Sequence, residues 1–137
     1  MKEFCLDLKN LHTLIEEIKN IVKEGNNIFL LRGDLASGKT TLVREYVKSF
    51  YPDEDVTSPT FSIQHQYGEI FHYDFYNHSL EELFNLGLLE WLENKGVHFI
   101  EWGDEHVEKI LKTNGYNMCV IEIFKLQTNR TYRIQNG

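Results

Sequence analysis

The 137-residue sequence has only two cysteines and two prolines, and it contains no long apolar run. Cys5 and Cys119 lie far apart and match no Cys-x-x-Cys spacing, so neither a disulfide framework nor a structural zinc site is indicated. We expect both to be reduced, buried thiols. No window approaches the roughly 18 apolar residues of a membrane span, and the N-terminus lacks the apolar segment of a signal peptide. We therefore expect a cytoplasmic protein without membrane contact.

Basic side chains are scarce in the middle of the chain. Residues 53–108 hold 13 acidic side chains and a single basic one, Lys95, whereas residues 112–137 hold four basic side chains against Glu122 alone. The net charge of −7 argues against direct nucleic-acid binding, because neutralising phosphates needs clustered Lys and Arg. An acidic body with a basic edge favours partner proteins of complementary charge, although a solvated acidic face explains the pattern equally well.

The composition, with 42% hydrophobic and 26% charged residues, is that of an ordinary globular chain. The length is typical of one domain with a single core. No internal repeat, low-complexity stretch or linker divides the sequence. We therefore expect one domain over residues 1–137.

Hydrophobic periodicity predicts alternating strands and helices. The expected strands are 4–8, 27–32, 61–67, 70–76, 97–100, 118–126 and 131–134, and the expected helices are 11–22, 42–50, one that begins at 80 and a short one over 107–111. Asn10 and Gly25 are placed to cap and end the first helix, and Ser79 with Glu82 forms a capping box for the third. The pattern predicts an α/β fold with a mixed central sheet flanked by helices, an aromatic hairpin and a C-terminal hairpin.

The aromatic hairpin can pair in two registers. A two-residue turn at Gly68 and Glu69 would mix apolar and polar side chains on one face. We prefer a three-residue loop over 67–69, because it separates the two kinds of side chain. The apolar face would then hold Phe61, Ile63, His65, Phe71, Tyr73 and Phe75, and the opposite face would hold Ser62, His72 and Asp74.

Residues 33–40, Gly-Asp-Leu-Ala-Ser-Gly-Lys-Thr, match the G-x-x-x-x-G-K-[ST] pattern of nucleotide-binding P-loops. A buried strand precedes the motif and an amphipathic helix follows it, as required for backbone N–H groups to point at phosphate oxygens. Lys39 would bridge the β- and γ-phosphates, and the Thr40 hydroxyl would ligate Mg²⁺. The predicted nucleotide-binding residues are Gly33, Asp34, Leu35, Ala36, Ser37, Gly38, Lys39, Thr40 and Thr41.

A P-loop site also needs a carboxylate at the end of a neighbouring strand. Glu101 follows the apolar run 97–100 and is the plainer candidate for metal contact, while Asp74 ends the run 71–74. Lys39, Asp74 and Glu101 are the predicted catalytic residues, and either carboxylate would orient the attacking water. Thr40 and Glu101 are the predicted metal ligands.

A polar turn over residues 57–60 leads into the aromatic hairpin. Pro59 restricts the backbone of Ser58 to extended geometry and presents the neighbouring hydroxyls of Ser58 and Thr60. These hydroxyls either act as a switch that senses a γ-phosphate or form an ordinary hydroxyl-bonded turn. The sequence does not separate the two interpretations.

Four motifs in order resemble the TsaE family, also called YjeE. They are the P-loop over 33–41, Ser-Pro-Thr-Phe at 58–61, His-Tyr-Asp-Phe-Tyr at 72–76 and Glu-Trp at 101–102. The members of this family are small bacterial ATPases needed to make threonylcarbamoyladenosine in tRNA. The resemblance runs from the first predicted helix through Trp102.

The resemblance implies roles for particular residues and partners. Lys39, Thr40 and Glu101 would serve ATP and Mg²⁺, Asp74 would support hydrolysis, and Trp102 would lie near the nucleotide. A complex with TsaD and TsaB subunits is also implied, in which ATP turnover resets the catalytic cycle of the partner enzyme. Contact with tRNA would then be indirect.

The chain departs from the family pattern at three places. Ala36-Ser37 replaces Gly-Ala in the loop, Asn77 replaces an arginine after the Asp-x-Tyr motif, and Gly103 replaces a proline after Glu-Trp. The sequence has no arginine between residues 45 and 129. An arginine that acts within this chain would have to be Arg130 or Arg133; otherwise a partner supplies the cation.

Two other functions fit the P-loop. One is a small-molecule kinase, although the chain leaves little room for an acceptor-binding lid. The other is a nucleotide-gated binding module with little catalysis, such as a GTPase-like switch. The one near match to a guanine-reading N-K-x-D is Asn94-Lys95-Gly-Val97, in which Val97 lacks the carboxylate that pairs with guanine. The sequence therefore favours adenine.

Overall fold

The computed structural model describes residues 2–34, 37–56, 63–126 and 129–136. The strands are β1 (Lys2–Leu6), β2 (Ile28–Arg32), β3 (Gln64–Tyr67), β4 (Ile70–Asp74), β5 (Val97–Glu101), β6 (Cys119–Lys125) and β7 (Arg130–Asn136). The helices are α1 (His12–Lys23), α2 (Lys39–Phe50), α3 (Leu80–Leu86), α4 (Leu88–Leu92) and α5 (Glu105–Thr113), with a 3₁₀ turn at Leu8–Asn10.

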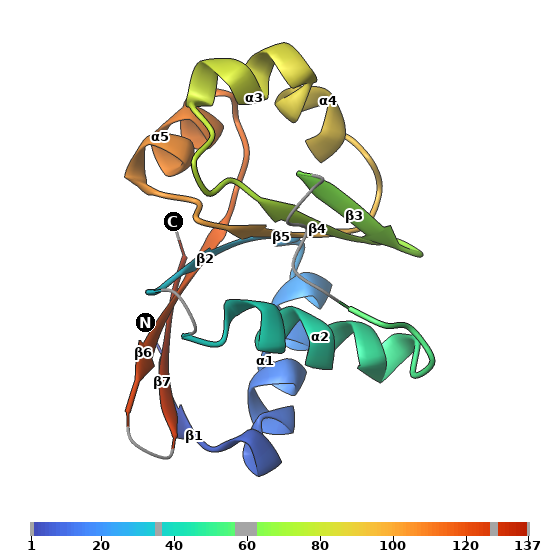
Figure 1. Cartoon of the computed structure of the whole chain (residues 1–137), viewed down its shortest axis with the longest axis vertical. Helices are drawn as coiled ribbons and strands as arrows, with labels where there is room; N and C mark the ends of the chain where they lie inside the picture. The colour runs from blue at the N-terminus through green and yellow to red at the C-terminus, as the bar shows by residue number, and fades with distance from the viewer. Residues whose placement is uncertain (1, 35–36, 57–62, 127–128, 137) are drawn as a thin grey trace.

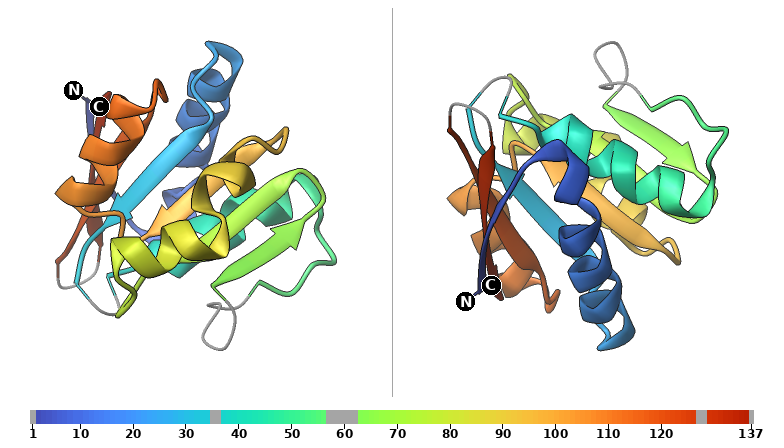
Figure 2. Two further views of the ribbon diagram at one scale, coloured as in Figure 1. Left: turned by 90° about the horizontal axis from the view of Figure 1, so that it is seen from above. Right: turned by 90° about the horizontal axis from the view of Figure 1, so that it is seen from below.

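The seven strands form one mixed sheet in the order β1-β7-β6-β2-β5-β4-β3. Helices α1 and α2 cover one face, and α3, α4 and α5 cover the other (Figure 1). The same layering is visible from above and from below in Figure 2. Among the described residues, no helix is long and apolar enough to cross a membrane. The architecture is the mixed α/β fold that the sequence predicts.

Strand β2 shows why the apolar runs form the centre of the sheet. It pairs in parallel with β5 on one side and β6 on the other. Phe29 and Leu31 pack in the core on the α1–α2 face, and Ile28 and Leu30 pack on the opposite face. A strand covered on both faces reads as a continuous apolar run. Each such side chain contributes about 1.5–3 kcal/mol when buried.

The parallel pairing of β2, β5 and β4 brings the carboxyl ends of these strands to one edge of the sheet. Leu31 pairs with Glu101, and Asp74 also pairs with Glu101. The P-loop follows β2 directly, so both predicted carboxylates end beside it. Ligand sites of α/β sheets commonly lie at this edge.

Two of the three predicted caps are as expected, and one is wrong. The Ser79 side chain accepts a hydrogen bond from the Glu82 backbone at 3.1 Å. Gly25 follows α1 with a φ of 100°, which suits a helix end. Asn10 does not cap α1, because its backbone and side-chain N–H groups both donate to Asp7 Oδ1. This local bond closes the 3₁₀ turn, and α1 begins two residues later at His12.

The preferred register of the aromatic hairpin is also wrong. Tyr67 pairs with Ile70 and His65 with His72, so the turn consists of Gly68 and Glu69 alone. Gly68 has a φ of 60°, and Gly is favoured at the first position of such two-residue turns. The expected separation into apolar and polar faces fails because β4 is an interior strand that pairs with both β3 and β5 and is buried on both faces.

The two thiols differ in exposure. Cys119 is buried in β6, and burial raises the pKa of its thiol to about 12. Cys5 is exposed, contrary to expectation. It lies in β1, at the edge of the sheet, where the strand pairs with β7 alone.

Candidate nucleotide-binding site

A cleft of about 420 Å³ lies at the edge of the sheet where the P-loop follows β2. Its walls come from the P-loop and α2, from the ends of β4 and β5, and from β7. Its lining residues are Ser37, Gly38, Lys39, Thr40, Thr41, Asp74, Tyr76, Glu101, Trp102 and Arg130.

The described part of the P-loop directs the start of α2 into this cleft. Gly38 is the N-cap of the helix and has a φ of 112°, a conformation that side chains with a Cβ rarely adopt. The first backbone N–H groups of a helix have no partner within the helix and form a natural anion site. Lys39 Nζ donates to the carbonyl oxygens of Gly33 at 2.6 Å and Asp34 at 2.9 Å.

The Lys39 ammonium lies in a buried and electrostatically mixed environment. Burial lowers its pKa, and the carboxylates of Glu101, Asp74 and Asp34 oppose that shift. Its Nζ also lies 4.2 Å from the ring centroid of Trp102, within the range of a cation–π contact. Cation, carboxylates and indole therefore gather within one cleft.

Trp102 forms a side of the cleft in an unusual backbone conformation. Its φ is 64°, in the left-handed region where a bulky residue costs of the order of 1–3 kcal/mol. Its backbone N–H donates to Leu31 O at 3.1 Å, and its ring centroid lies 4.9 Å from that of Tyr76. These contacts hold the indole beside Lys39.

Glu101 links the P-loop to the neighbouring strands. Its side chain is buried, and Oε2 accepts a hydrogen bond from Thr40 Oγ1 at 2.9 Å. His72 Nε2 hydrogen-bonds to the same oxygen. Among the described residues, the other oxygen, Oε1, accepts no hydrogen bond.

The residues of the cleft fit the requirements of Mg²⁺. A hydroxyl oxygen of Thr40 and a carboxylate of Glu101 adjoin one another, and Asp74 lines the same cleft. Mg²⁺ prefers oxygen ligands and is usually held by one or two carboxylates together with substrate phosphates and water. The described residues contain no cluster of three or more His, Cys, Asp or Glu side chains that would form a complete protein cage. This is a donor set that suits a metal bound with a nucleotide.

One of the two candidate arginines reaches the cleft. Arg130 Nε donates to Ser37 O at 2.9 Å, and the residue lines the cleft. Arg133 instead packs over the ring of Phe124, with its Nε 3.8 Å from a carboxylate oxygen of Glu3. Asn77, at the position of the family's arginine, has a φ of 60° and is not among the residues that line the cleft.

The structure brings most of the predicted site residues together. Ser37, Gly38, Lys39, Thr40, Thr41, Asp74, Glu101 and Trp102 line the cleft, and Gly33 and Asp34 contribute carbonyl oxygens to Lys39. The predicted loop residues Leu35 and Ala36 and the switch candidates Ser58 and Thr60 lie outside the described residues.

Sequence reasoning did not place His72 and Tyr76 in the site. His72 stands two residues before Asp74 in a strand, so the alternation of side chains puts both on one face. That pattern was visible, but the bond from His72 to Glu101 depends on how β4 pairs with β5. Tyr76 follows the strand, and its contact with Trp102 arises only in the folded chain.

A family model described as "Threonylcarbamoyl adenosine biosynthesis protein TsaE" matches residues 6–133. The chain belongs to the TsaE family. The resemblance carried by the four motifs is thereby confirmed, and it places the chain in a family of tRNA threonylcarbamoyladenosine biosynthesis.

Individual TsaE proteins and a solved structure agree with this assignment. The TsaE protein of Rickettsia typhi is 39% identical over 108 residues, which cover 69% of this chain and 74% of the relative. That of Treponema pallidum is 35% identical over 91 residues, covering 64% of this chain and 67% of the relative. The crystal structure of Bacillus subtilis YdiB matches with a TM-score of 0.61 at 20% identity, covering 96% of this chain and 83% of that chain. The chain thus has the P-loop NTPase-like fold.

Proposed function

We propose that this TsaE protein is the Mg²⁺-dependent subunit that binds and hydrolyses ATP in tRNA N6-threonylcarbamoyladenosine synthesis. The proposed ATPase domain spans residues 1–137. Its turnover would be slow alone and completed by partners. The observation that carries the proposal is the hydrogen bond of Thr40 Oγ1 to Glu101 Oε2 at 2.9 Å, inside the cleft that Lys39 lines. It joins the P-loop hydroxyl to a strand-end carboxylate, which is the pairing that a metal–nucleotide site requires.

Four side chains of the cleft and the N-terminus of α2 would take part in this reaction. The N-terminus of α2 and Lys39 would bind the phosphate oxygens and offset their charge. Thr40 and Glu101 would hold Mg²⁺, which when bound draws charge from the phosphate oxygens. We assign orientation of the attacking water to Asp74, because it lines the same cleft and Glu101 is assigned to the metal. Water adds to the γ-phosphorus as the bond between that phosphorus and the ADP oxygen breaks, and the water gives up a proton to solvent, so the products are ADP and inorganic phosphate.

The proposed partners are TsaD-like and TsaB-like subunits, and ATP turnover would reset the partner enzyme. The acidic balance of the chain supports an indirect relation to tRNA, because its net charge of −7 is unsuited to binding a phosphate backbone. The tRNA would then be held by other subunits. The location that fits this role is the cytoplasm.

Replacement of Lys39 tests the proposal. Lys39→Ala removes the ammonium that would bind the phosphates, and we expect ATP hydrolysis by the complex with TsaD and TsaB to fall about 100-fold or more. Cells depleted of the wild-type chain should lose threonylcarbamoyladenosine from total tRNA, measured by mass spectrometry. The wild-type gene should restore the nucleoside, and the Lys39→Ala gene should not.

Lys95→Ala serves as the control, because Lys95 is exposed and does not line the nucleotide cleft. It should support normal turnover and normal tRNA modification. Wild-type hydrolysis in Lys39→Ala would contradict the assignment of the P-loop. An unchanged nucleoside level after depletion would remove the pathway role and leave nucleotide binding intact. Phosphate transfer from ATP to a nucleoside or nucleotide would instead identify a kinase.

A further inference from the structure

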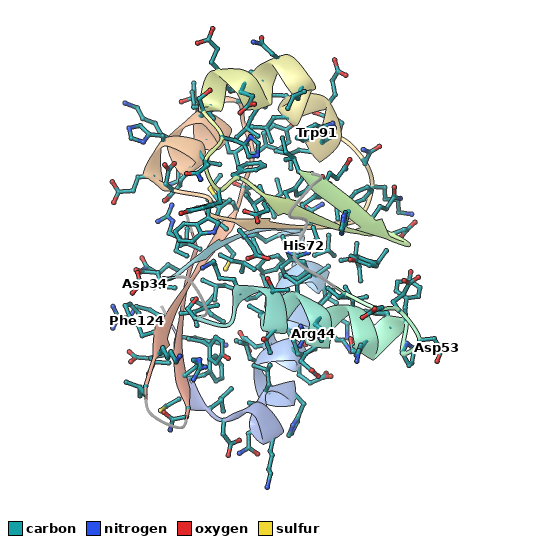
Figure 3. All side chains as sticks on the ribbon, in the orientation of Figure 1. Asp34, Arg44, Asp53, His72, Trp91 and Phe124 are labelled. Carbon is teal, nitrogen blue, oxygen red and sulfur yellow. The ribbon has the colours of Figure 1, made fainter. Side chains whose placement is uncertain are left out.

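A completely buried histidine lies beside the proposed metal ligand. His72 has no exposed surface, and its Nε2 hydrogen-bonds to Glu101 Oε2. Figure 3 shows it in the interior of the molecule, at the level between β4 and α2. Histidine is fully buried less often than apolar residues, and a buried polar group normally needs a hydrogen-bond partner. Glu101 is that partner.

The pairing of β4 with β5 explains how the imidazole reaches this carboxylate. In the parallel register His72 is opposite Phe99, and Asp74 is opposite Glu101. Side chains two residues apart in a strand share a face, so His72 and Asp74 both lie on the face of the sheet that Phe99 and Glu101 occupy. The histidine is two residue pairs further from the strand ends than Asp74, and it approaches Glu101 from the interior.

The bonds around Glu101 leave its two oxygens in different situations. A carboxylate only accepts hydrogen bonds, so we assign the proton of this contact to His72 Nε2. Oε2 therefore accepts from both His72 and Thr40. Oε1 accepts from no group in the described part of the chain. Such an arrangement fixes the rotation of the carboxylate.

We propose that His72 is a positioning residue, which holds Oε2 of Glu101 so that Oε1 is presented to a divalent cation at the nucleotide. The proposal rests on the proposed function. Carboxylates that bind metals are commonly oriented by such hydrogen bonds, and loss of the orienting partner typically weakens metal binding or activity by about 10–100-fold. His72 itself touches neither nucleotide nor metal in this scheme.

If His72 contributed only to packing, its substitutions would have different effects. Within the described residues, Nδ1 of His72 has no hydrogen-bond partner, so the bond to Glu101 is the polar contact that the ring makes. An apolar residue of similar size would preserve packing and remove this bond. A residue that keeps a donor at the position of Nε2 would preserve the bond. The two roles can therefore be separated by substitution.

The experiment compares His72→Leu with His72→Gln. Binding of a fluorescent ATP analogue is titrated with Mg²⁺ in the full chain, and the same affinity is measured in EDTA. We expect His72→Leu to raise the Mg²⁺ concentration at half-maximal effect by about 10-fold or more. Its metal-free affinity should stay within about twofold of wild type. His72→Gln should lie within about threefold of wild type in Mg²⁺ requirement, because its amide nitrogen can donate to the same oxygen.

His98→Leu is the matched control. His98 is equally buried, but it bonds to Tyr73 and to the Asn94 carbonyl and packs in the core on the opposite face of the sheet. We expect the control to lower the thermal stability without changing the Mg²⁺ requirement. If His72→Leu does not fold, His72→Asn replaces it, because the shorter amide ends near the position of Nδ1 and does not reach Glu101.

Repeating the Mg²⁺ titration in a Glu101→Gln background tests whether His72 acts through Glu101. Because His72 acts through Glu101, His72→Leu should change the Mg²⁺ requirement by less than about twofold in that background. A normal Mg²⁺ requirement in folded His72→Leu would overturn the proposal, and so would an equal loss in both backgrounds. A wild-type chain whose nucleotide affinity does not respond to Mg²⁺ would overturn the proposed function itself, which separates the two failures.

Discussion

Arg130 lines the proposed nucleotide cleft from β7, and its Nε–H donates to the carbonyl of Ser37, 93 residues earlier in the chain. The middle of the chain contains no arginine, and Asn77 stands where the resemblance leads us to expect one. A guanidinium at this place offers further donors to an anionic ligand, because its bonds to the carbonyl oxygens of Ser37 and Asn129 use two of its five N–H groups. We infer that Arg130 supplies part of the positive charge that an arginine at position 77 would have supplied.

Arg130→Gln should therefore weaken nucleotide binding. Loss of a charge-assisted contact costs about 1.5–3 kcal/mol, so we expect the Kd of Mg·ADP to rise about 10-fold or more. Calorimetric titration measures this change. Arg133→Gln is the control, because Arg133 packs over Phe124 outside the cleft. Equal affinities of the two variants would contradict the role given to Arg130.

Residues of the site differ in how far the sequence reveals them. The P-loop residues are contiguous, and the strand before them and helix after them are local patterns, so Lys39 and Thr40 could be placed from sequence. Asp74 and Glu101 could be proposed because each ends an apolar run. Arg130 could only be named beside Arg133 and a cation from a partner, because its approach depends on the pairing of β7 with β6.

Among the secondary-structure elements, the aromatic hairpin marks the limit of pattern reasoning. Its two strands were found from their apolar residues and the turn at Gly68, and the sheet was correctly expected to be mixed. The predicted register is wrong because the alternation of exposed and buried side chains applies only to strands with one face in solvent. In β4 the polar His72 is buried and hydrogen-bonds to Glu101, so a polar residue at this position does not indicate exposure to solvent.

The connection between α4 and β5 is tightly packed at Gly96. Its φ is 145°, and a Cβ there would lie 2.0 Å from the backbone oxygen of Glu69. Gly96→Ala combines backbone strain with a clash that a backbone atom cannot easily relieve. We expect the free energy of unfolding, measured in urea, to fall by about 3 kcal/mol or more.

Gly25→Ala separates the two contributions. Gly25 also has a positive φ, 100°, but a Cβ there would meet no atom within 4 Å. This variant should lose only the strain of the left-handed conformation, about 1–2 kcal/mol. Similar losses in the two variants would show that crowding against Glu69 contributes nothing to the role of Gly96.

At the scale of the whole molecule, the cleft joins segments from much of the chain. The P-loop, β4, β5 and β7 all contribute lining residues, so a bound ligand would tie the central strands to the C-terminal hairpin. The net charge is −7, and Asp74 and Glu101 lie in the strongly acidic middle of the chain. A nucleotide polyphosphate is itself anionic, so metal-free nucleotide would meet electrostatic repulsion. Mg²⁺ would remove that conflict.

Thermal unfolding should therefore depend on nucleotide and metal together. A ligand at 100 times its Kd stabilises a folded chain by about 2.7 kcal/mol, which for a chain of this length raises Tm by about 10 °C. We expect this rise with Mg·ADP, a much smaller one with ADP in EDTA, and none with adenosine, which lacks phosphates for Lys39. Mg·GDP at the same concentration should stabilise less, because the sequence lacks the guanine-reading N-K-x-D: its near match over 94–97 has Val97 in place of the carboxylate and lies at the end of β5 opposite the cleft. A larger shift with Mg·GDP would contradict the adenine preference, and an equal shift in EDTA would show that Thr40 and Glu101 hold no metal.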